Sequence, residues 1–335
     1  MISKKIDIFG AGISGLVAAI RLSRDGYRVF VHEKRAAIGG PPQWHPSVHQ
    51  QVFDLEKTSE YIGIDVSPCF FPVNSHTFYL YGRKHIILNP KDNYVCLKGG
   101  IESSIEKYLY SKALDCGVEF SFDQSLDIES IQKLMNGDSF HIIATGLEKE
   151  TYDALGIRHI TVHGFRASGS AGEMPHASSF LGEYTNHEFA YFASSGDLRF
   201  ALLFARGVIG KRSLDAFRKH LCETENIIFD NWQFSTGAIP LENNLVKNGL
   251  VLSGTLSGMI DPFTLNGISG ALISGRIASM YFQDPNKALI EFNRFTKNFH
   301  LKSLIRRFFV TMPFRKIFLL PVLYINNRFK TVGVI

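Results

Sequence analysis

The sequence lacks the features that mark several common protein classes. Its four cysteines, among 335 residues, form no C-x-x-C pair, which argues against a zinc site or a redox dithiol. No apolar run is long enough to span a bilayer. The opening residues are not a signal peptide, because their short apolar run leads directly into glycines. We therefore expect no metal and a cytoplasmic location, either free or peripheral at the inner membrane surface.

The composition is that of a globular protein rich in aromatic residues. The formal net charge of +5 indicates excess lysine and does not imply a nucleic-acid partner. A chain of this length favours two closely connected domains. Its 28 Phe and 12 Tyr require a large core, an apolar pocket or a surface that meets lipid.

The N-terminal segment has the pattern strand, glycine turn, helix, strand. We expect strands at 5–9 and 27–32, and a helix at 16–24 that ends before Gly26. An acidic residue, Glu33, follows the second strand. The turn between the first strand and the helix is formed by Gly10, Ala11, Gly12, Ile13, Ser14 and Gly15.

Each residue of this turn has a physical role in binding a dinucleotide. Gly10 permits the tight turn, Gly12 lets a pyrophosphate approach the backbone, and Gly15 allows close packing of helix and strand. The free N–H groups at the start of the helix favour the phosphates. Glu33 can accept hydrogen bonds from a ribose. The segment therefore predicts a dinucleotide site.

Two further segments resemble FAD enzymes of the glutathione-reductase-like superfamily. After Glu33 the chain reads KRAAIGG, with Lys34, Arg35 and the pair Gly39-Gly40. That superfamily has a Gly-Gly pair in the same place. The stretch FHIIATG, at 140–146, ends in Thr145 and Gly146 and resembles the strand by which such chains return to the FAD domain. The resemblance implies that FAD is the cofactor.

A third segment, LVLSGTLSGMIDPFTLNGISGA, resembles the geranylgeranyl reductase-like branch of the p-hydroxybenzoate hydroxylase superfamily. That branch commonly has Gly-Asp where this chain has Gly254-Thr255, and the aspartate binds the ribityl chain of FAD. Thr255 keeps a hydroxyl, so we expect FAD affinity to fall about tenfold at most. The resemblance implies further FAD contacts at Asp261, Leu265, Asn266, Gly267 and Ile268.

A second departure from the family lies before a predicted helix. Related proteins carry an arginine that reaches FAD where this chain has Lys98, in VCLKGG. Lysine keeps the charge but loses the bidentate guanidinium. A surface lysine is the other interpretation of this residue. The helix should begin at Ser103 or Ser104 and end before Gly117.

The pattern predicts an α/β (α+β) fold with a discontinuous Rossmann-like FAD-binding domain. We expect an antiparallel substrate domain built from a hairpin at 77–88, strands at 158–166, 189–193, 198–205 and 226–234, and a helix at 211–221. Many aromatic residues on that sheet favour an apolar pocket. The expected division is 1–75, 95–156 and 237–284 for the FAD domain, 76–94 and 157–236 for the substrate domain, and 285–335 for a helical tail.

Two histidines and the C-terminal tail carry hypotheses of their own. His45 or His49, after Gly39-Gly40, could donate a proton near the flavin, and a surface loop is the alternative. A helix should start at Asp284-Pro285 and end at Pro313. Basic and aromatic residues alternate over 300–330, which suits a membrane surface or a cap over the active site.

The leading hypothesis is an FAD-dependent oxidoreductase that reduces carbon–carbon double bonds of an apolar, isoprenoid-like or lipid substrate. No second glycine motif is present, so NAD(P)H or a reduced electron carrier would bind transiently. A monooxygenase is the first alternative. A halogenase is less favoured, because the W-x-W-x-I-P motif is absent. A non-catalytic FAD- or lipid-binding protein is the alternative from another class. The oligomeric state is open.

Overall fold

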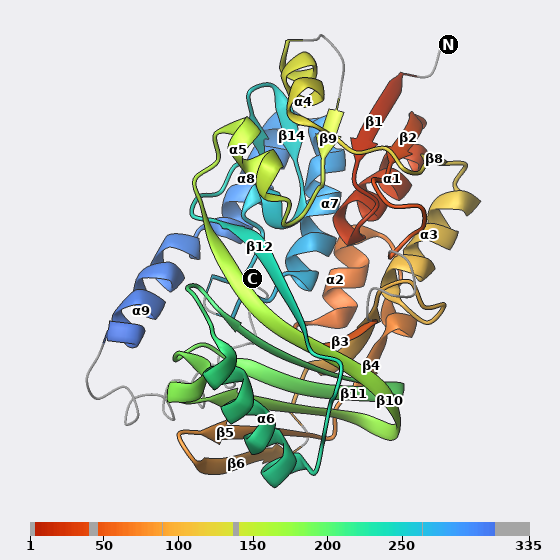
Figure 1. Cartoon of the computed structure of the whole chain (residues 1–335). Coiled ribbons are helices and arrows are strands. Elements are labelled where there is room, and N and C mark those ends of the chain that lie inside the picture. Colours follow the sequence, from red (N-terminus) through yellow and green to blue (C-terminus); the bar gives the residue numbers. More distant parts are fainter. Residues whose placement is uncertain (1–3, 40–45, 89, 137–140, 263, 312–335) are drawn as a thin grey trace.

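The structure, a computed structural model, describes residues 4–39, 46–88, 90–136, 141–262 and 264–311. Its first layer is a six-stranded sheet that is parallel except at one edge, and Figure 1 shows it in the upper half of the molecule. The strand order is β13 (Val246–Lys247), β14 (Leu250–Leu252), β9 (His141–Ile143), β1 (Lys5–Phe9), β2 (Arg28–His32) and β8 (Glu119–Ser121).

Helices cover both faces of this sheet. One face is buried by α1 (Ile13–Arg24), α3 (Ile105–Asp115), α7 (Ile268–Tyr281) and α8 (Pro285–Thr296), which share one apolar core with α2 (Leu55–Ile62). The other face is buried by α4 (Ile128–Met135) and α5 (Lys149–Leu155). The strand–turn–helix–strand pattern read from the N-terminal sequence is confirmed, because β1, α1 and β2 lie where the glycines and apolar spacing predicted them.

The second layer is a five-stranded sheet in the lower half of Figure 1. Its strands are β5 (Ser75–Leu80), β6 (Arg83–Leu88), β10 (His159–Leu181), β11 (Ala190–Ala205) and β12 (Gln233–Pro240). The predicted hairpin is β5–β6, turning at Tyr81 and Gly82, which both have positive φ. The sheet is antiparallel as expected except for β5 and β10, which pair in parallel.

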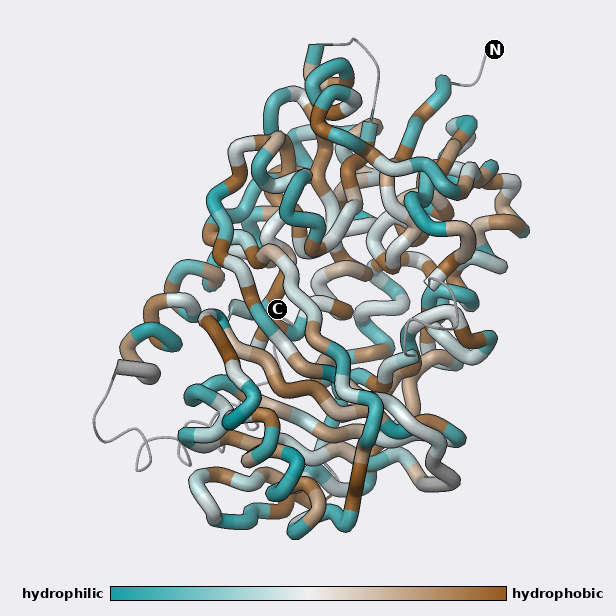
Figure 2. Tube along the Cα trace, viewed as in Figure 1, coloured by the Kyte–Doolittle hydropathy of each residue, from teal (hydrophilic) through white to brown (hydrophobic). Residues whose placement is uncertain are grey.

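Both faces of this second sheet are covered. Because side chains alternate along a strand, Phe192 and Leu203 pack with α6 (Lys211–Glu225), while Ala193 and Phe200 pack on the other face. On that other face lies a small sheet that the sequence did not reveal, formed by β3 (Ser47–Val52), β7 (Asn93–Lys98) and β4 (Phe70–Pro72). Figure 2 shows the apolar residues gathered in the interior strands.

Several predicted elements were wrong in extent. The strands expected at 158–166, 189–193 and 198–205 are parts of two long strands, β10 and β11, which continue through irregular pairings despite their glycines. The strand predicted at 226–234 was wrong for most of its length. Asn226 ends α6 in the left-handed conformation, and Ile227 and Phe229 are buried because the following loop packs back on that helix.

The C-terminal helix also differs from the prediction. The expected single helix is two helices, α8 and α9 (Phe299–Thr311), which are separated by Lys297 and Asn298. Asp284 caps α8 through a hydrogen bond from the Lys287 N–H at 2.9 Å, and Pro285 opens it. The predicted end at Pro313 lies outside the described residues.

The contact between α6 and the second sheet gives a first prediction. Phe217 is fully buried and packs edge-on against Phe180, with ring centroids 5.4 Å apart. Phe217→Ala leaves a cavity there and should lower the free energy of unfolding by about 3–5 kcal/mol in chemical denaturation. The exposed neighbour on the same helix supplies the control, since Arg218→Ala should change stability by less than about 0.5 kcal/mol. Equal stabilities for the two variants would contradict this packing.

Candidate functional site

Three loops meet at the carboxyl edge of the parallel sheet. They follow β1, β9 and β14, which lie side by side in the order β14, β9, β1. The Ala144 N–H donates to Phe9 O at 2.8 Å, and the Ser253 N–H donates to Ile143 O at 3.0 Å. The three segments that the sequence analysis assigned to a cofactor are therefore brought together, although more than two hundred residues separate the first from the last. Ligands of open α/β sheets bind at this edge.

Backbone contacts fix the glycine turn. A Cβ atom added at Gly10 would lie 2.4 Å from Ala144 O, and one at Gly15 would lie 2.0 Å from Gly10 O. A Cβ atom at Gly254, which has a φ of +71°, would lie 2.6 Å from Ser14 Oγ. No larger residue fits these positions without a backbone shift, so the glycines hold the loops against one another.

Gly12 differs from these glycines because the space beside it is open. A Cβ atom added there would meet no atom within 4 Å. Gly12 is the N-cap of α1 and supplies no side-chain cap, and Gly267 opens α7 in the same way. Both helices therefore present unpaired N–H groups at the site, where a helix N-terminus attracts negative charge.

Glu33 lies beside the turn, as predicted. Its carboxylate accepts a hydrogen bond from the Ala11 N–H at 2.8 Å and another from the Arg35 N–H at 3.1 Å. Each oxygen keeps lone pairs for further donors such as ribose hydroxyls. Lys34 instead forms an ion pair with Glu148.

The segment after β14 approaches the same turn. Thr255 lies in a short 3₁₀ helix, Gly254–Ser257. A Cβ atom added at Gly267 would lie 3.4 Å from the Thr255 hydroxyl. Thr255 thus stands between the start of α1 and the start of α7, near Ile268. Leu265 has a φ of +58°, a conformation that is uncommon for a bulky residue and that often marks a functional loop.

Asp261 organises the loop rather than presenting a free carboxylate. Its Oδ1 accepts from the Thr264 N–H at 2.9 Å, and its Oδ2 forms an ion pair with Lys302 of α9 at 2.7 Å. Backbone bonds join Asp261 to Asn266 and to Leu265. We refer to residues 261–266 as the α7 entry loop.

Two buried polar atoms of the predicted set have no hydrogen-bond partner among the described residues. They are Thr145 Oγ1 and Asn266 Oδ1. Most buried polar groups in folded proteins have a partner, so an orphaned group needs an explanation, and a ligand or a water is one. The Asn266 amide nitrogen donates to Gln50 O at 3.2 Å, which ties the α7 entry loop to β3. These orphans, together with the open space at Gly12, fit a bound dinucleotide.

Gly39 lies against the turn that follows Lys98. A Cβ atom at Gly39 would lie 2.1 Å from Gly99 O, so the loop after β2 rests on the turn after β7. Lys98 is 3.5 Å from Glu106 on α3, and Ser104 caps that helix as predicted. Gly146 accepts a hydrogen bond from the Tyr152 hydroxyl. Gly40 and His45 lie outside the described residues.

His49 is a neutral, hydrogen-bonded group. Its Nδ1 is 2.9 Å from the Tyr191 hydroxyl, and its Nε2 is 2.9 Å from Ser47 Oγ. Desolvation by burial, and then the nearby charges of Lys98 and Arg166, lower the pKa of His49 to about 3. Burial raises the pKa of Tyr191 well above its usual value. Near neutral pH the pair is therefore uncharged and can pass a proton but does not hold an extra one.

Sequence reasoning missed the polar network on β3. Gln50 Nε2 donates to Asn93 Oδ1 at 2.9 Å and lies 2.8 Å from His76 Nδ1, and His76 Nε2 is 2.9 Å from Ser179 Oγ. The available signal was the run of polar residues His49, Gln50 and Gln51 between Val48 and Val52. This network joins the small sheet to the five-stranded sheet, beside the α7 entry loop.

The predicted aromatic wall is divided between different clusters. Tyr79 and Phe192 lie in the ordinary core under α6, with Phe165 and Trp232 packed against it. Phe200 lies on the opposite face, toward β3, and Tyr191 packs beside it. Three further aromatic residues of the predicted substrate domain, Phe78, Tyr81 and Phe189, lie in a separate cluster. Period-two alternation explains the division, because neighbouring residues of a strand face opposite ways.

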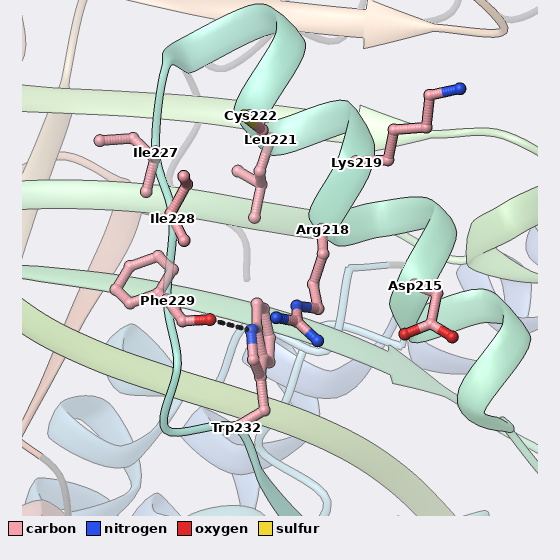
Figure 3. A pocket seen from close by; sticks show the side chains of 9 residues that line it. All are labelled: Asp215, Arg218, Lys219, Leu221, Cys222, Ile227, Ile228, Phe229 and Trp232. Atoms are coloured by element: carbon pink, nitrogen blue, oxygen red, sulfur yellow. Dashed lines mark hydrogen bonds between the residues drawn. The ribbon is translucent and has the colours of Figure 1, made fainter.

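A surface recess lies elsewhere, between α6 and the loop before β12 (Figure 3). It encloses about 260 Å³ and has Leu221, Cys222, Phe229 and Trp232 among its lining residues. Because α6 packs on the sheet face opposite β3, this recess is separate from the glycine turn. Among the described residues, no group of three or more histidine, cysteine or acidic side chains is placed to hold a metal ion.

Comparisons with known proteins agree with this geometry. A family profile described as an NAD(P)-binding Rossmann-like domain matches residues 8–54. The 4,4'-diaponeurosporene oxygenase of Staphylococcus aureus is 26% identical over 181 residues, covering 44% of this chain and 35% of that protein. The match thus spans about a third of the length of such curated relatives.

Solved structures share the fold over nearly the whole chain. A geranylgeranyl bacteriochlorophyll reductase-like protein from Thermoplasma acidophilum superposes with a TM-score of 0.69 at 15% identity, covering 92% of this chain and 89% of that one. A probable FAD-dependent monooxygenase from Pseudomonas aeruginosa gives 0.66 at 13% identity, covering 96% and 100%. The chain therefore has the fold of FAD-dependent oxidoreductases and monooxygenases, and the resemblance expected from the sequence is confirmed at that level.

Gly12 and Gly15 have different surroundings, so substitutions at the two positions should affect flavin content and stability differently. Gly12→Val should lower the melting temperature less than a substitution at Gly15 does, because an added Cβ atom at Gly12 meets no protein atom within 4 Å, yet it should remove bound flavin by occupying the space for phosphate. Gly15→Ala is the matched comparison and should lower the melting temperature, because its Cβ meets Gly10 O. Calorimetry and the visible absorbance of purified protein measure the two effects. Full flavin content in folded Gly12→Val protein would disprove the placement of the phosphates.

The lowered pKa of His49 predicts a pH-dependent stability. The folded-state pKa is about 3 and the unfolded value about 6.5, so between them the unfolded chain binds more protons. The stabilisation is therefore present above about pH 6.5 and is lost as the pH falls. Between pH 7 and 5, wild type should lose roughly 1–2 kcal/mol more unfolding free energy than His49→Gln. Parallel pH curves for the two proteins would show that His49 ionises normally.

Proposed function

We propose that the chain is an FAD-dependent oxidoreductase whose cofactor lies at the carboxyl edge of the parallel sheet. The orphaned Thr145 hydroxyl and Asn266 Oδ1, together with the open space at Gly12, are the observation that carries this proposal. The turn at Gly10–Gly15 would hold the pyrophosphate, and Glu33 the ribose. Thr255 and the α7 entry loop would face the ribityl chain and the flavin ring.

The reaction that we favour is reduction of a carbon–carbon double bond in an apolar, isoprenoid-like substrate. The flavin supplies the hydride, and the protein aligns the substrate and excludes water. Phe200 and Tyr191 pack on the face of β11 toward β3, so the surroundings of this part of the proposed site are apolar. The N-terminus of α7, which has no side-chain cap, would stabilise negative charge on a reduced cofactor.

The proton source must be a group other than a protonated His49. Its ring is neutral near pH 7, so His49 can orient or relay through Tyr191 but does not carry the proton to be donated. We keep His45 as the proposed donor on the basis of its place in the sequence after Gly39-Gly40.

NAD(P)H or a reduced electron carrier would bind transiently and supply electrons. The division into FAD domain, substrate domain and helical tail given above is also part of this proposal.

A monooxygenase is the second candidate. The relatedness to an oxygenase of Staphylococcus aureus over 181 residues favours it, as does the fold shared with an FAD-dependent monooxygenase. The same apolar face would then have to protect an oxygen-activating cofactor from water. A non-catalytic FAD- or lipid-binding protein would use the same site without turnover.

One experiment separates these functions. The flavin is reduced without oxygen and mixed with polyprenyl substrates. We expect flavin reoxidation with a product heavier by two hydrogens. Turnover that requires oxygen and adds an oxygen atom would assign the protein to the monooxygenases, and a flavin that no donor reduces would favour the binding protein. His45→Ala should slow the anaerobic step, and an unchanged rate would show that another group is the proton donor. His49→Gln tests the proposed proton relay through Tyr191.

A further inference from the structure

The helix α9 is attached to the protein by its charged side. Arg306 forms an ion pair with Glu188, a buried carboxylate that also binds Arg206 at 2.8 Å. One turn earlier, Lys302 binds Asp261 of the α7 entry loop. Phe299, at the start of α9, is 6% exposed and packs with Ile239 and Ile260. The basic residues of 300–330 were expected at a membrane surface or in a cap over the active site, and the structure places Arg306 against the protein.

The apolar side of the same helix faces outward. Its residues are spaced i, i+3, i+4 and i+7, which places them on one face of a helix. A surface helix ordinarily buries such a stripe. Here it is exposed, and Figure 1 shows α9 projecting from the body of the molecule. We call these residues the α9 stripe: Leu301 (58% exposed), Leu304 (68%), Ile305 (47%) and Phe308 (61%).

The charges around the stripe point to one kind of partner. From Phe292 to Thr311 the sequence has no acidic residue and five lysines and arginines, of which Arg294 pairs with Glu291 and two, Lys302 and Arg306, form the inward ion pairs. Arg307 is exposed next to the stripe, and Lys297 is exposed just before the helix. Apolar residues flanked by cations fit the interface of an anionic bilayer, where apolar side chains enter the headgroup region and cations meet lipid phosphates. Within the described residues, no helix is long and apolar enough to cross a membrane.

We propose that the α9 stripe docks the protein on the surface of an anionic membrane. The inward ion pairs of Lys302 and Arg306 set the orientation, because they leave only the apolar side of α9 for the lipid. The helix is about 20 Å long and lies flat on the surface. Docking would place the α7 entry loop, and with it the proposed flavin site, beside the source of an apolar substrate. Only this last consequence rests on the proposed function.

Vesicle sedimentation with the full-length protein tests the docking. The vesicles contain phosphatidylcholine with or without phosphatidylglycerol. Wild type should sediment with the anionic vesicles, and the double variant Leu304→Glu/Phe308→Glu should bind at least about tenfold more weakly. Ile228→Glu replaces another exposed apolar residue, on the α6 side, and should bind as wild type does. Wild-type binding by the double variant, or no binding by wild type, overturns the proposal.

A second measurement tests whether something other than lipid covers the α9 stripe. A polarity-sensitive dye is placed on Leu304→Cys in a Cys222→Ser background, since Cys222 is exposed. The dye should report water before vesicles are added and an apolar environment afterwards. An apolar signal without vesicles overturns the proposal: light scattering then assigns the stripe to a second copy if the protein is a dimer, or to residues 312–335 if it is a monomer. Flavin absorbance of the same samples shows separately whether the cofactor proposal holds.

Discussion

The close approach of three backbone segments at one edge of the parallel sheet is the constraint on which the site depends. Gly10 touches Ala144, and Gly254 touches Ser14, at distances that leave no room for a side chain. These contacts bring the starts of α1 and α7 together, and with them two sets of unpaired N–H groups. A favourable place for negative charge therefore follows from packing alone, before any charged side chain contributes.

Local signals were sufficient for the glycine turn and for α1, α3, α6 and the start of α8, whereas α2, α4 and α5 were not predicted. A glycine turn between a buried strand and an amphipathic helix has few alternatives, and the caps at Ser104 and Asp284 are decided by neighbours three residues away. The long strand β10 was not predictable in this way. Its middle, from 167 to 180, is rich in Gly and Ser, and pairing with β11 and β5 on its two sides outweighs those local preferences.

The sequence named segments that the structure brings together at the candidate site, but not the ionisation of their residues or their partners. A sequence names His49, but its neutral state follows from burial and from Lys98 and Arg166, which come from other strands. Likewise Asp261 appeared as a cofactor contact, whereas the structure shows its carboxylate bound to Lys302. The Asp261–Lys302 ion pair joins the α7 entry loop to α9, the last described helix. The same loop therefore contacts both the outer helix and the interior of the site.

The order of strands in the parallel sheet has a consequence for synthesis on the ribosome. β1 and β2 emerge early, but β14, which completes the sheet beside β9, begins only at Leu250. The N-terminal strands can pair as they appear, yet the chamber for the dinucleotide stays incomplete until most of the chain has been translated. Contacts so distant in sequence form slowly, and the exposed edge of β9 is open to wrong pairing meanwhile. A ligand already bound at the partly formed sheet would shorten the time during which the edge of β9 is open to wrong pairing.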